Sequence, residues 1–119
     1  MYDFTGQTVI VTGGTRGIGR CISEGFLKAG ARVIGVYSTN EVAAAQFKQD
    51  NSQFAEKIDI QKCDVSQYKE VEELFQYIDK NYESFEVLVN NAGIRKDAVL
   101  AMMKESEWQD VLNVNLSGV

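Results

Sequence analysis

The 119-residue chain contains no histidine and no proline. Without histidine, this chain cannot form a Ser–His–Asp triad, use imidazole as an acid or base, or bind zinc through histidine ligands. Cysteine is also scarce: Cys21 and Cys63 are far apart and form no C-x-x-C pair. We expect both to be reduced, packed thiols, and we expect no metal site.

Long apolar runs and basic runs are absent as well. No apolar segment approaches the ~20 residues that a membrane-spanning helix needs. The first five residues lack the basic and apolar regions of a secretory signal. The net charge of −5 disfavours binding to nucleic acid or to an anionic membrane. We therefore expect a soluble cytoplasmic protein in which residues 1–119 form one domain.

Short apolar runs alternate with helical patterns along the whole chain. Such alternation indicates βαβ units and a parallel sheet, and right-handed crossovers give the strand order 3-2-1-4. The expected class is therefore α/β, a Rossmann-type doubly wound sheet with ligand bound between the first and fourth strands. The expected strands are 8–12, 32–37, 58–63 and 86–90, and the expected helices are 17–29, 41–50, 67–82 and one from about 107.

Apolar stripes predict which faces of the helices are buried. The first helix has its stripe at Ile18, Ile22, Phe26 and Ala29, and the third has Tyr68, Val71, Phe75, Ile78 and Tyr82. In the order 3-2-1-4, the fourth strand has no outer neighbour, although its run 87–89 is apolar on both faces. An exposed apolar edge of this kind predicts association or poor solubility for the 119 residues alone.

A glycine-rich turn follows the first expected strand. Gly13, Gly17 and Gly19 have the spacing G-x-x-x-G-x-G and lead into a helical pattern. Backbone N–H groups at a helix N-terminus bind phosphate, and glycine lets the chain approach it closely. The turn is therefore a candidate phosphate site, with a tight strand-to-helix turn without ligand as the alternative.

A missing acid after the second expected strand bears on the choice of dinucleotide. Folds that select an unphosphorylated ribose place Asp or Glu about 20 residues beyond the glycine turn. Here residues 37–40 contain no acid, and Arg16 lies in the turn. Because a guanidinium suits a phosphate, this combination favours NADP(H). Ser38 can add a hydroxyl donor, or it can form an S-x-x-E capping box with Glu41.

Two further motifs complete a resemblance. Asn90-Asn91-Ala92-Gly93 follows an apolar run, and Cys63-Asp64-Val65 ends another. Together with the glycine turn, they resemble the short-chain dehydrogenase/reductase family.

The resemblance implies a set of cofactor contacts. Thr15 and Ile18 would join Arg16 and the glycines of the turn. Asp64 would accept from the adenine amino group and the Val65 backbone would reach adenine, although Asp64 could instead cap the helix that follows. Asn91, Ala92 and Gly93 would lie beneath the adenosine ribose, whereas Asn90 is expected to hold neighbouring strands together.

Asn115 is the candidate catalytic residue. It is a polar position on the otherwise apolar stripe of the last expected helix, Trp108 to Val119. The resemblance implies a catalytic asparagine here that supports a water relay to the active-site lysine. The alternative is a core asparagine with satisfied hydrogen bonds.

The resemblance covers only the first half of the family's fold. The family's catalytic Tyr-x-x-x-Lys pair, with its upstream Ser, is not found in this sequence. We therefore expect the 119 residues alone to be inactive, with the remaining catalytic groups beyond Val119 or absent.

The resemblance is greatest to NADPH-dependent reductases of 3-oxoacyl thioesters in fatty-acid synthesis, and it implies acyl carrier protein as a partner and a homotetramer for the longer protein. Acetoacetyl-CoA reductases are close to them. A dinucleotide-binding module without catalysis, or a truncated fragment, is the alternative.

Overall fold

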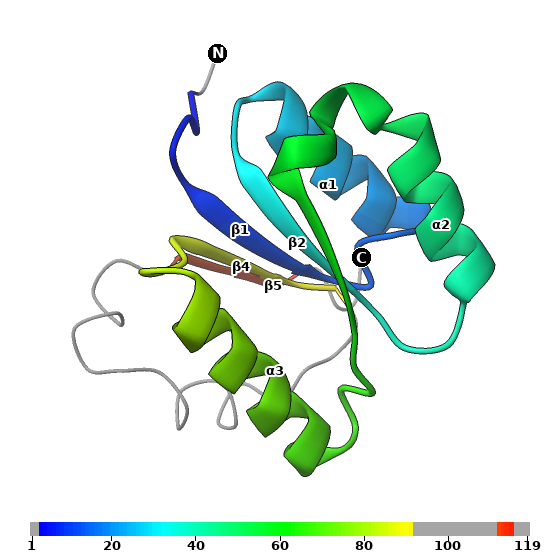
Figure 1. The fold of residues 1–119 in the computed structure, drawn as a ribbon, viewed down its shortest axis with the longest axis vertical. Coiled ribbons are helices and arrows are strands. Elements are labelled where there is room, and N and C mark those ends of the chain that lie inside the picture. The colour runs from blue at the N-terminus through cyan, green and yellow to red at the C-terminus, as the bar shows by residue number, and fades with distance from the viewer. Residues whose placement is uncertain (1–2, 92–111, 116–119) are drawn as a thin grey trace.

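A computed structural model describes residues 3–91 and 112–115 and shows a parallel five-stranded sheet with helices on both faces (Figure 1). The strand order is β3-β2-β1-β4-β5, which confirms the expected order 3-2-1-4 for the first four strands. The elements are β1 Thr8–Thr12, α1 Gly17–Lys28, β2 Arg32–Tyr37, α2 Glu41–Asp50, the 3-10 helix η1 Ser52–Lys57, β3 Ile58–Lys62, α3 Tyr68–Asn81, β4 Val87–Asn90 and β5 Leu112–Asn115.

β1 is the central strand of the sheet, and its residues are buried on both faces. All five residues of its sequence TVIVT are buried. Val9 pairs with Val33 of β2 on one side and with Val87 of β4 on the other, both in parallel. A strand that is covered on both faces needs apolar β-branched residues throughout, as this sequence provides.

The helices divide the core into two layers. Figure 1 shows α1 and α2 on one side of the sheet and α3 on the other. Leu27 of α1 and Phe47 of α2 pack with the side chains of Val9 and Val11. On the opposite face, α3 packs with Ile10, Ile34 and Leu88 through the buried residues Val71, Leu74, Phe75 and Ile78. The sheet is therefore doubly wound.

The stripe expected for α1 is displaced by one residue. α1 buries Gly19, Ser23 and Leu27, whereas Ile18 is 55% exposed. The small residues allow α1 to approach the sheet closely, so the large side chains Ile22 and Phe26 lie at the side of the contact, half-buried. At the start of α3, Tyr68 is 60% exposed, again outside the core.

The two cysteines differ in environment. Cys63 is buried at the end of β3, as expected, but Cys21 is exposed on α1. The expectation that both thiols are packed is wrong for Cys21, because the face of α1 that contacts the sheet is occupied by Gly19, Ser23 and Leu27.

The last described segment is a strand where the sequence suggested a helix. β5 pairs in parallel with β4, from Val87 with Leu112 to Asn90 with Asn115. The alternation Leu-Asn-Val-Asn fits a period of two as well as one side of a helix, and strand pairing satisfies the backbone groups at the edge of β4. The expectation of a helix over 112–115 and of an unpaired β4 is therefore wrong. The rest of that expected helix, including Trp108 and Val119, lies outside the described residues.

Candidate functional site

The polar motifs converge at one edge of the sheet. The strands are parallel, so the carboxyl ends of β1, β2, β3 and β4 lie at the same edge. The glycine turn follows β1, and Asn91 follows β4, the strand next to it. Because α1 and α3 cover opposite faces, the edge between β1 and β4 is the point where such sheets bind ligands.

The turn itself requires glycine at several positions. Gly13 and Gly17 have φ of +63° and +58°, a region that other residues rarely adopt. A Cβ on Gly19 would lie 1.9 Å from the carbonyl oxygen of Gly13. Gly14, which the motif spacing did not single out, is equally constrained, because its Cβ would lie 2.7 Å from the Val11 carbonyl oxygen.

Backbone donors are available at the start of α1. The first hydrogen bond of this helix is donated by Arg20 N–H to the Arg16 carbonyl, at 3.1 Å. The N–H groups of Gly17, Ile18 and Gly19 precede it and have no acceptor within the helix. The first turn of α1 contains no acidic residue. The positive end of the helix dipole is therefore open to an anion.

Hydrogen bonds connect this turn to β4. The Thr12 hydroxyl donates to the Val89 carbonyl at 3.3 Å and accepts from the Asn91 N–H at 2.9 Å. The Asn91 amide donates to the Gly13 carbonyl at 3.4 Å. Asn91, expected beneath the ribose, therefore also supports the glycine turn, while Asn90 is buried at the end of β4.

Ser23 is a supporting residue that the motifs did not reveal. Its hydroxyl is buried and lies 2.9 Å from the carbonyl oxygens of both Gly14 and Gly19. It therefore ties the second turn of α1 to the glycine turn. The available signal was a serine on the buried face of an amphipathic helix, which requires a hydrogen-bond partner.

Arg16 and Ser38 lie on the outside of the same edge. Arg16 is the N-cap of α1, with extended backbone, and its side chain is exposed. Within residues 3–91, its guanidinium forms no hydrogen bond or ion pair. Ser38 is also exposed, and the α2 N-cap is Asn40, whose side chain accepts from Ala43 N–H at 2.9 Å. The capping-box alternative for Ser38 is therefore wrong.

Thr15, by contrast, faces inward. Its side chain is 2% exposed, and its methyl group lies next to Gly35 of β2. The side chain thus packs the turn onto the sheet, while its neighbours Arg16 and Ile18 are exposed.

Asp64 holds a tight turn after β3. Its carboxylate accepts from the Ser66 N–H at 3.0 Å and from the Ser66 hydroxyl at 2.6 Å. These hydrogen bonds lower the pKa of Asp64 below its ordinary value. α3 begins later, at Tyr68, and its N-cap is Gln67. Val65 is half-buried against the α3 side of the core.

Cys63 is not an available nucleophile. Its side chain is 1% exposed. Burial, together with the nearby carboxylates of Glu70 and Asp64, raises the pKa of the thiol to about 11. Since the thiolate is the reactive form, Cys63 is a packing residue.

The remaining expected site residues are placed only in part. Asn115 is the last residue of β5 and pairs in register with Asn90, so it lies at the same carboxyl edge of the sheet. Ala92 and Gly93 lie outside the described residues. In the part of the chain that is described, no group of three or more Cys, Asp or Glu is arranged to hold a metal ion, and no helix is long and apolar enough to cross a membrane.

Comparisons with curated proteins point to enzymes of one family. Acetoacetyl-CoA reductase of Shinella zoogloeoides is 39% identical over 113 residues, which are 95% of this chain and 45% of the relative. The 3-oxoacyl-(acyl-carrier-protein) reductase FabG of Staphylococcus epidermidis is 39% identical over 114 residues, 95% of this chain and 46% of the relative. The 3beta-hydroxysteroid dehydrogenase 2 of Eggerthella lenta is 36% identical over 115 residues, 96% and 44% respectively. The chain thus spans less than half the length of these relatives.

Solved structures show the same fold. The Pseudomonas aeruginosa RhlG/NADP active-site complex matches with a TM-score of 0.68 and 33% identity, covering 77% of this chain and 36% of that chain. A short chain dehydrogenase from Bacillus anthracis matches with a TM-score of 0.66 and 29% identity, covering 72% and 34%.

The sequence model of one family covers nearly the whole chain. It is described as short chain dehydrogenase and matches residues 7–119. The sheet order, the glycine turn after β1 and the asparagine motif after β4 agree with this match. The chain belongs to the short-chain dehydrogenase family.

Proposed function

We propose that this chain is the dinucleotide-binding part of an NADPH-dependent oxidoreductase that reduces the carbonyl of a 3-oxoacyl thioester. The observation that carries the proposal is the glycine turn. A Cβ on Gly19 would fill the space between the Gly13 carbonyl and the Asn91 amide, and the N–H groups at the start of α1 lack acceptors within the helix. This arrangement fits the pyrophosphate of a dinucleotide.

Support for NADPH over NADH comes from the charges beside the turn. Arg16 is exposed and free of ion pairs among the described side chains, and residues 37–40 contain no carboxylate. A guanidinium can bind the 2′-phosphate through paired N–H groups, and Ser38 adds an exposed hydroxyl. The complex of RhlG, a structural relative, contains NADP.

Support for the substrate class comes from relatives. Two of the curated proteins above are reductases of acyl thioesters, acetoacetyl-CoA reductase and 3-oxoacyl-(acyl-carrier-protein) reductase. The third is named a hydroxysteroid dehydrogenase, so the shared chemistry is the interconversion of a carbonyl and a hydroxyl group. We place the protein in fatty-acid synthesis, as a cytoplasmic homotetramer acting on acyl groups on acyl carrier protein or coenzyme A.

The catalytic proposal rests on Asn115. Bound NADPH would supply the hydride, and Asn115, at the carboxyl edge beside Asn90, would support the proton relay. The Tyr-x-x-x-Lys pair that would deliver the proton is absent from these 119 residues. We therefore expect this chain to bind the dinucleotide without turning over a substrate.

A charge-removal experiment tests the cofactor assignment. We expect Arg16→Ala to weaken NADPH binding about 10- to 100-fold, because a hydrogen bond to a charged group contributes ~1.5–3 kcal/mol. NADH binding should change by less than about twofold, since NADH has no 2′-phosphate. Titrations that follow nicotinamide fluorescence measure both affinities.

The control for Arg16→Ala is Lys28→Ala. Lys28 is exposed at the other end of the same helix, so its loss changes the net charge equally. The ratio of NADPH to NADH affinity should stay at the wild-type value in this variant. Equal losses for NADPH in the two variants would show that Arg16 does not bind the 2′-phosphate.

A further inference from the structure

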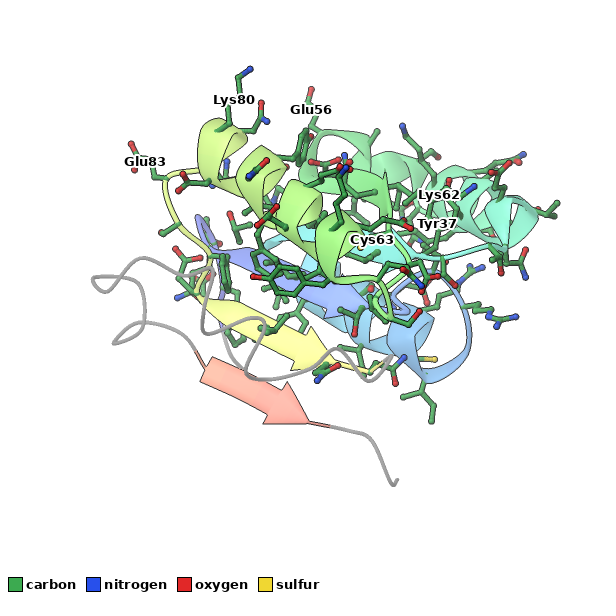
Figure 2. The ribbon with its side chains drawn as sticks, turned by 90° about the horizontal axis from the view of Figure 1, so that it is seen from below. Tyr37, Glu56, Lys62, Cys63, Lys80 and Glu83 are labelled. Carbon is green, nitrogen blue, oxygen red and sulfur yellow. The ribbon has the colours of Figure 1, made fainter. Side chains whose placement is uncertain are left out.

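A second cation lies at the end of β3, paired with the first acid after β2. Lys62 is the last residue of β3 and pairs in register with Tyr37, the last residue of β2. Its Nζ lies 3.0 Å from Oε1 of Glu41, the first residue of α2. Figure 2 shows Tyr37, Lys62 and Cys63 grouped together, far from Lys80 and Glu83 at the opposite end of the molecule.

Glu41 is an acid immediately after the segment 37–40, so an unpaired carboxylate there would disfavour NADP. An Asp or Glu near the end of the second strand accepts from the ribose 2′-hydroxyl and repels a 2′-phosphate. Glu41 comes directly after residues 37–40, and its side chain is 66% exposed. An unpaired carboxylate here would oppose the contribution of Arg16.

We propose that Lys62 is a specificity-determining residue that neutralises Glu41, so that the corner between the glycine turn and β2 accepts a 2′-phosphate. The inference rests on the proposed dinucleotide function and extends it to residues outside the family motifs. Lys62 acts through Glu41 and is not a catalytic residue.

The pair is poorly suited to a purely structural role. The two side chains are 55% and 66% exposed, and exposed ion pairs contribute little to folding. The end of β3 is already held to the end of β2 by the pairing of Tyr37 with Lys62 and by the Cys63 N–H, which donates to the Tyr37 carbonyl at 2.9 Å. The start of α2 is capped by Asn40, without help from Glu41. The main consequence of the contact is local charge: the Lys62 ammonium, whose pKa Glu41 raises, offsets the charge of the Glu41 carboxylate.

The test compares two ligands that differ only in the 2′-phosphate. Adenosine 2′,5′-bisphosphate and adenosine 5′-monophosphate are titrated by calorimetry against the wild type, Lys62→Met, Glu41→Gln and the double variant. We expect Lys62→Met to weaken binding of the bisphosphate roughly threefold to tenfold at low salt and to leave the monophosphate unchanged. High salt should reduce the difference, because exposed charges are screened.

The double variant shows whether Lys62 acts by neutralising Glu41 or only by adding a positive charge of its own. If Lys62 acts by cancelling Glu41, removing both charges restores the bisphosphate affinity to within about twofold of the wild type. A double variant as weak as Lys62→Met would overturn the proposal. Lys57→Met is the matched control, because Lys57 is exposed at the opposite end of β3, and it should leave the ratio of the two affinities unchanged.

The failures of the two proposals are distinguishable. A wild type that binds neither nucleotide would refute the dinucleotide function and this inference with it. A wild type that prefers the bisphosphate, together with a Lys62→Met variant of unchanged preference, would refute only the role of Lys62.

Discussion

Single residues at the glycine turn act mainly through the space they leave empty. Gly19 faces the Gly13 carbonyl and the Asn91 amide, and Gly14 faces Val11 and Ser23. The turn can approach β4 only because these positions carry no Cβ, and the same open space would admit the phosphate of the proposed dinucleotide. In the proposed site, these residues would therefore contribute a backbone position and not a side-chain contact.

Gly19→Ala tests this directly. The added Cβ would lie 1.9 Å from the Gly13 oxygen, so the turn must move. We expect a loss of stability of at least ~1 kcal/mol and loss of NADPH binding. Gly25→Ala in the same helix is the control: its Cβ meets nothing within 4 Å, so it should stabilise the protein by up to ~1 kcal/mol through helix propensity. Urea unfolding of both variants gives the comparison, and equal stabilities would contradict this account.

The two ends of β1 offer a second matched pair. Thr8 and Thr12 are both fully buried, but Thr12 bonds Val89 and Asn91, whereas the Thr8 hydroxyl has no hydrogen-bond partner among the described residues. We expect Thr12→Val to destabilise the protein by ~1–3 kcal/mol and to weaken NADPH binding.

Thr8→Val should be neutral or stabilising by up to ~1 kcal/mol, because an unpaired buried hydroxyl is replaced by a methyl group. Thermal unfolding measures both changes. A Thr8→Val variant that loses as much stability as Thr12→Val would show that burial alone, and not the hydrogen bonds at Thr12, sets the cost.

The sequence predicted single residues correctly where the spacing of neighbouring residues determines the local backbone. The pattern at Gly13, Gly17 and Gly19 predicted the turn, because positive φ and a helix start are local requirements. It missed Gly14 and Ser23, because their constraints come from contacts with Val11 and with the turn's carbonyl groups. Their role becomes visible only when the helix is packed on the sheet.

At the scale of elements, the strands and first three helices begin and end close to the expected positions. Apolar β-branched runs were sufficient signals for the strands, and α1 ends just before Gly30, whose φ of +96° does not continue a helix. The buried face of α1 was not predictable in detail, because close packing selected Gly19 and Ser23 over Ile18. The sequence at 112–115 fits both the two-residue period of a strand and the period of a helix. Its pairing with β4 therefore decides that this segment is a strand.

The contact between β3 and the end of α3 makes the stability of the protein depend on pH. Asp59 of β3 accepts from the hydroxyl groups of Tyr77 and Tyr82, at 2.7 and 2.6 Å. The hydrogen bond to Asp59 raises the pKa of Tyr77, and burial followed by this hydrogen bond raises the pKa of Tyr82. The folded protein therefore keeps protons that the unfolded chain releases near pH 10.

We expect the contribution of Tyr77 and Tyr82 to the free energy of unfolding to be constant below pH ~10. This contribution should fall as the pH rises above ~10. Because both side chains are partly exposed, the loss per tyrosine should be below ~1 kcal/mol. Urea midpoints between pH 8 and 11 should fall less steeply for Tyr82→Phe than for the wild type. Tyr68→Phe, at an exposed position, should keep the wild-type slope, and a wild-type slope in Tyr82→Phe would contradict the assignment.

At the scale of the whole molecule, sheet topology is what makes the site. Thr12 and Asn91 are far apart in sequence but adjacent in space, because β1 and β4 are neighbours in the order β3-β2-β1-β4-β5. Handedness rules made this order predictable from the alternation of elements. The substrate pocket was not predictable in the same way, because the chain spans less than half the length of its curated relatives.

The most direct test of the central claim is an amide NMR titration with NADPH. The account predicts that the resonances of Gly17, Ile18 and Gly19 shift most, because the helix N-terminus offers unpaired N–H groups to the pyrophosphate. Amides of η1 at Ser52–Lys57 should stay unchanged, since this segment precedes β3 at the opposite edge of the sheet. Binding of NADPH that leaves the glycine-turn amides unshifted would contradict the account.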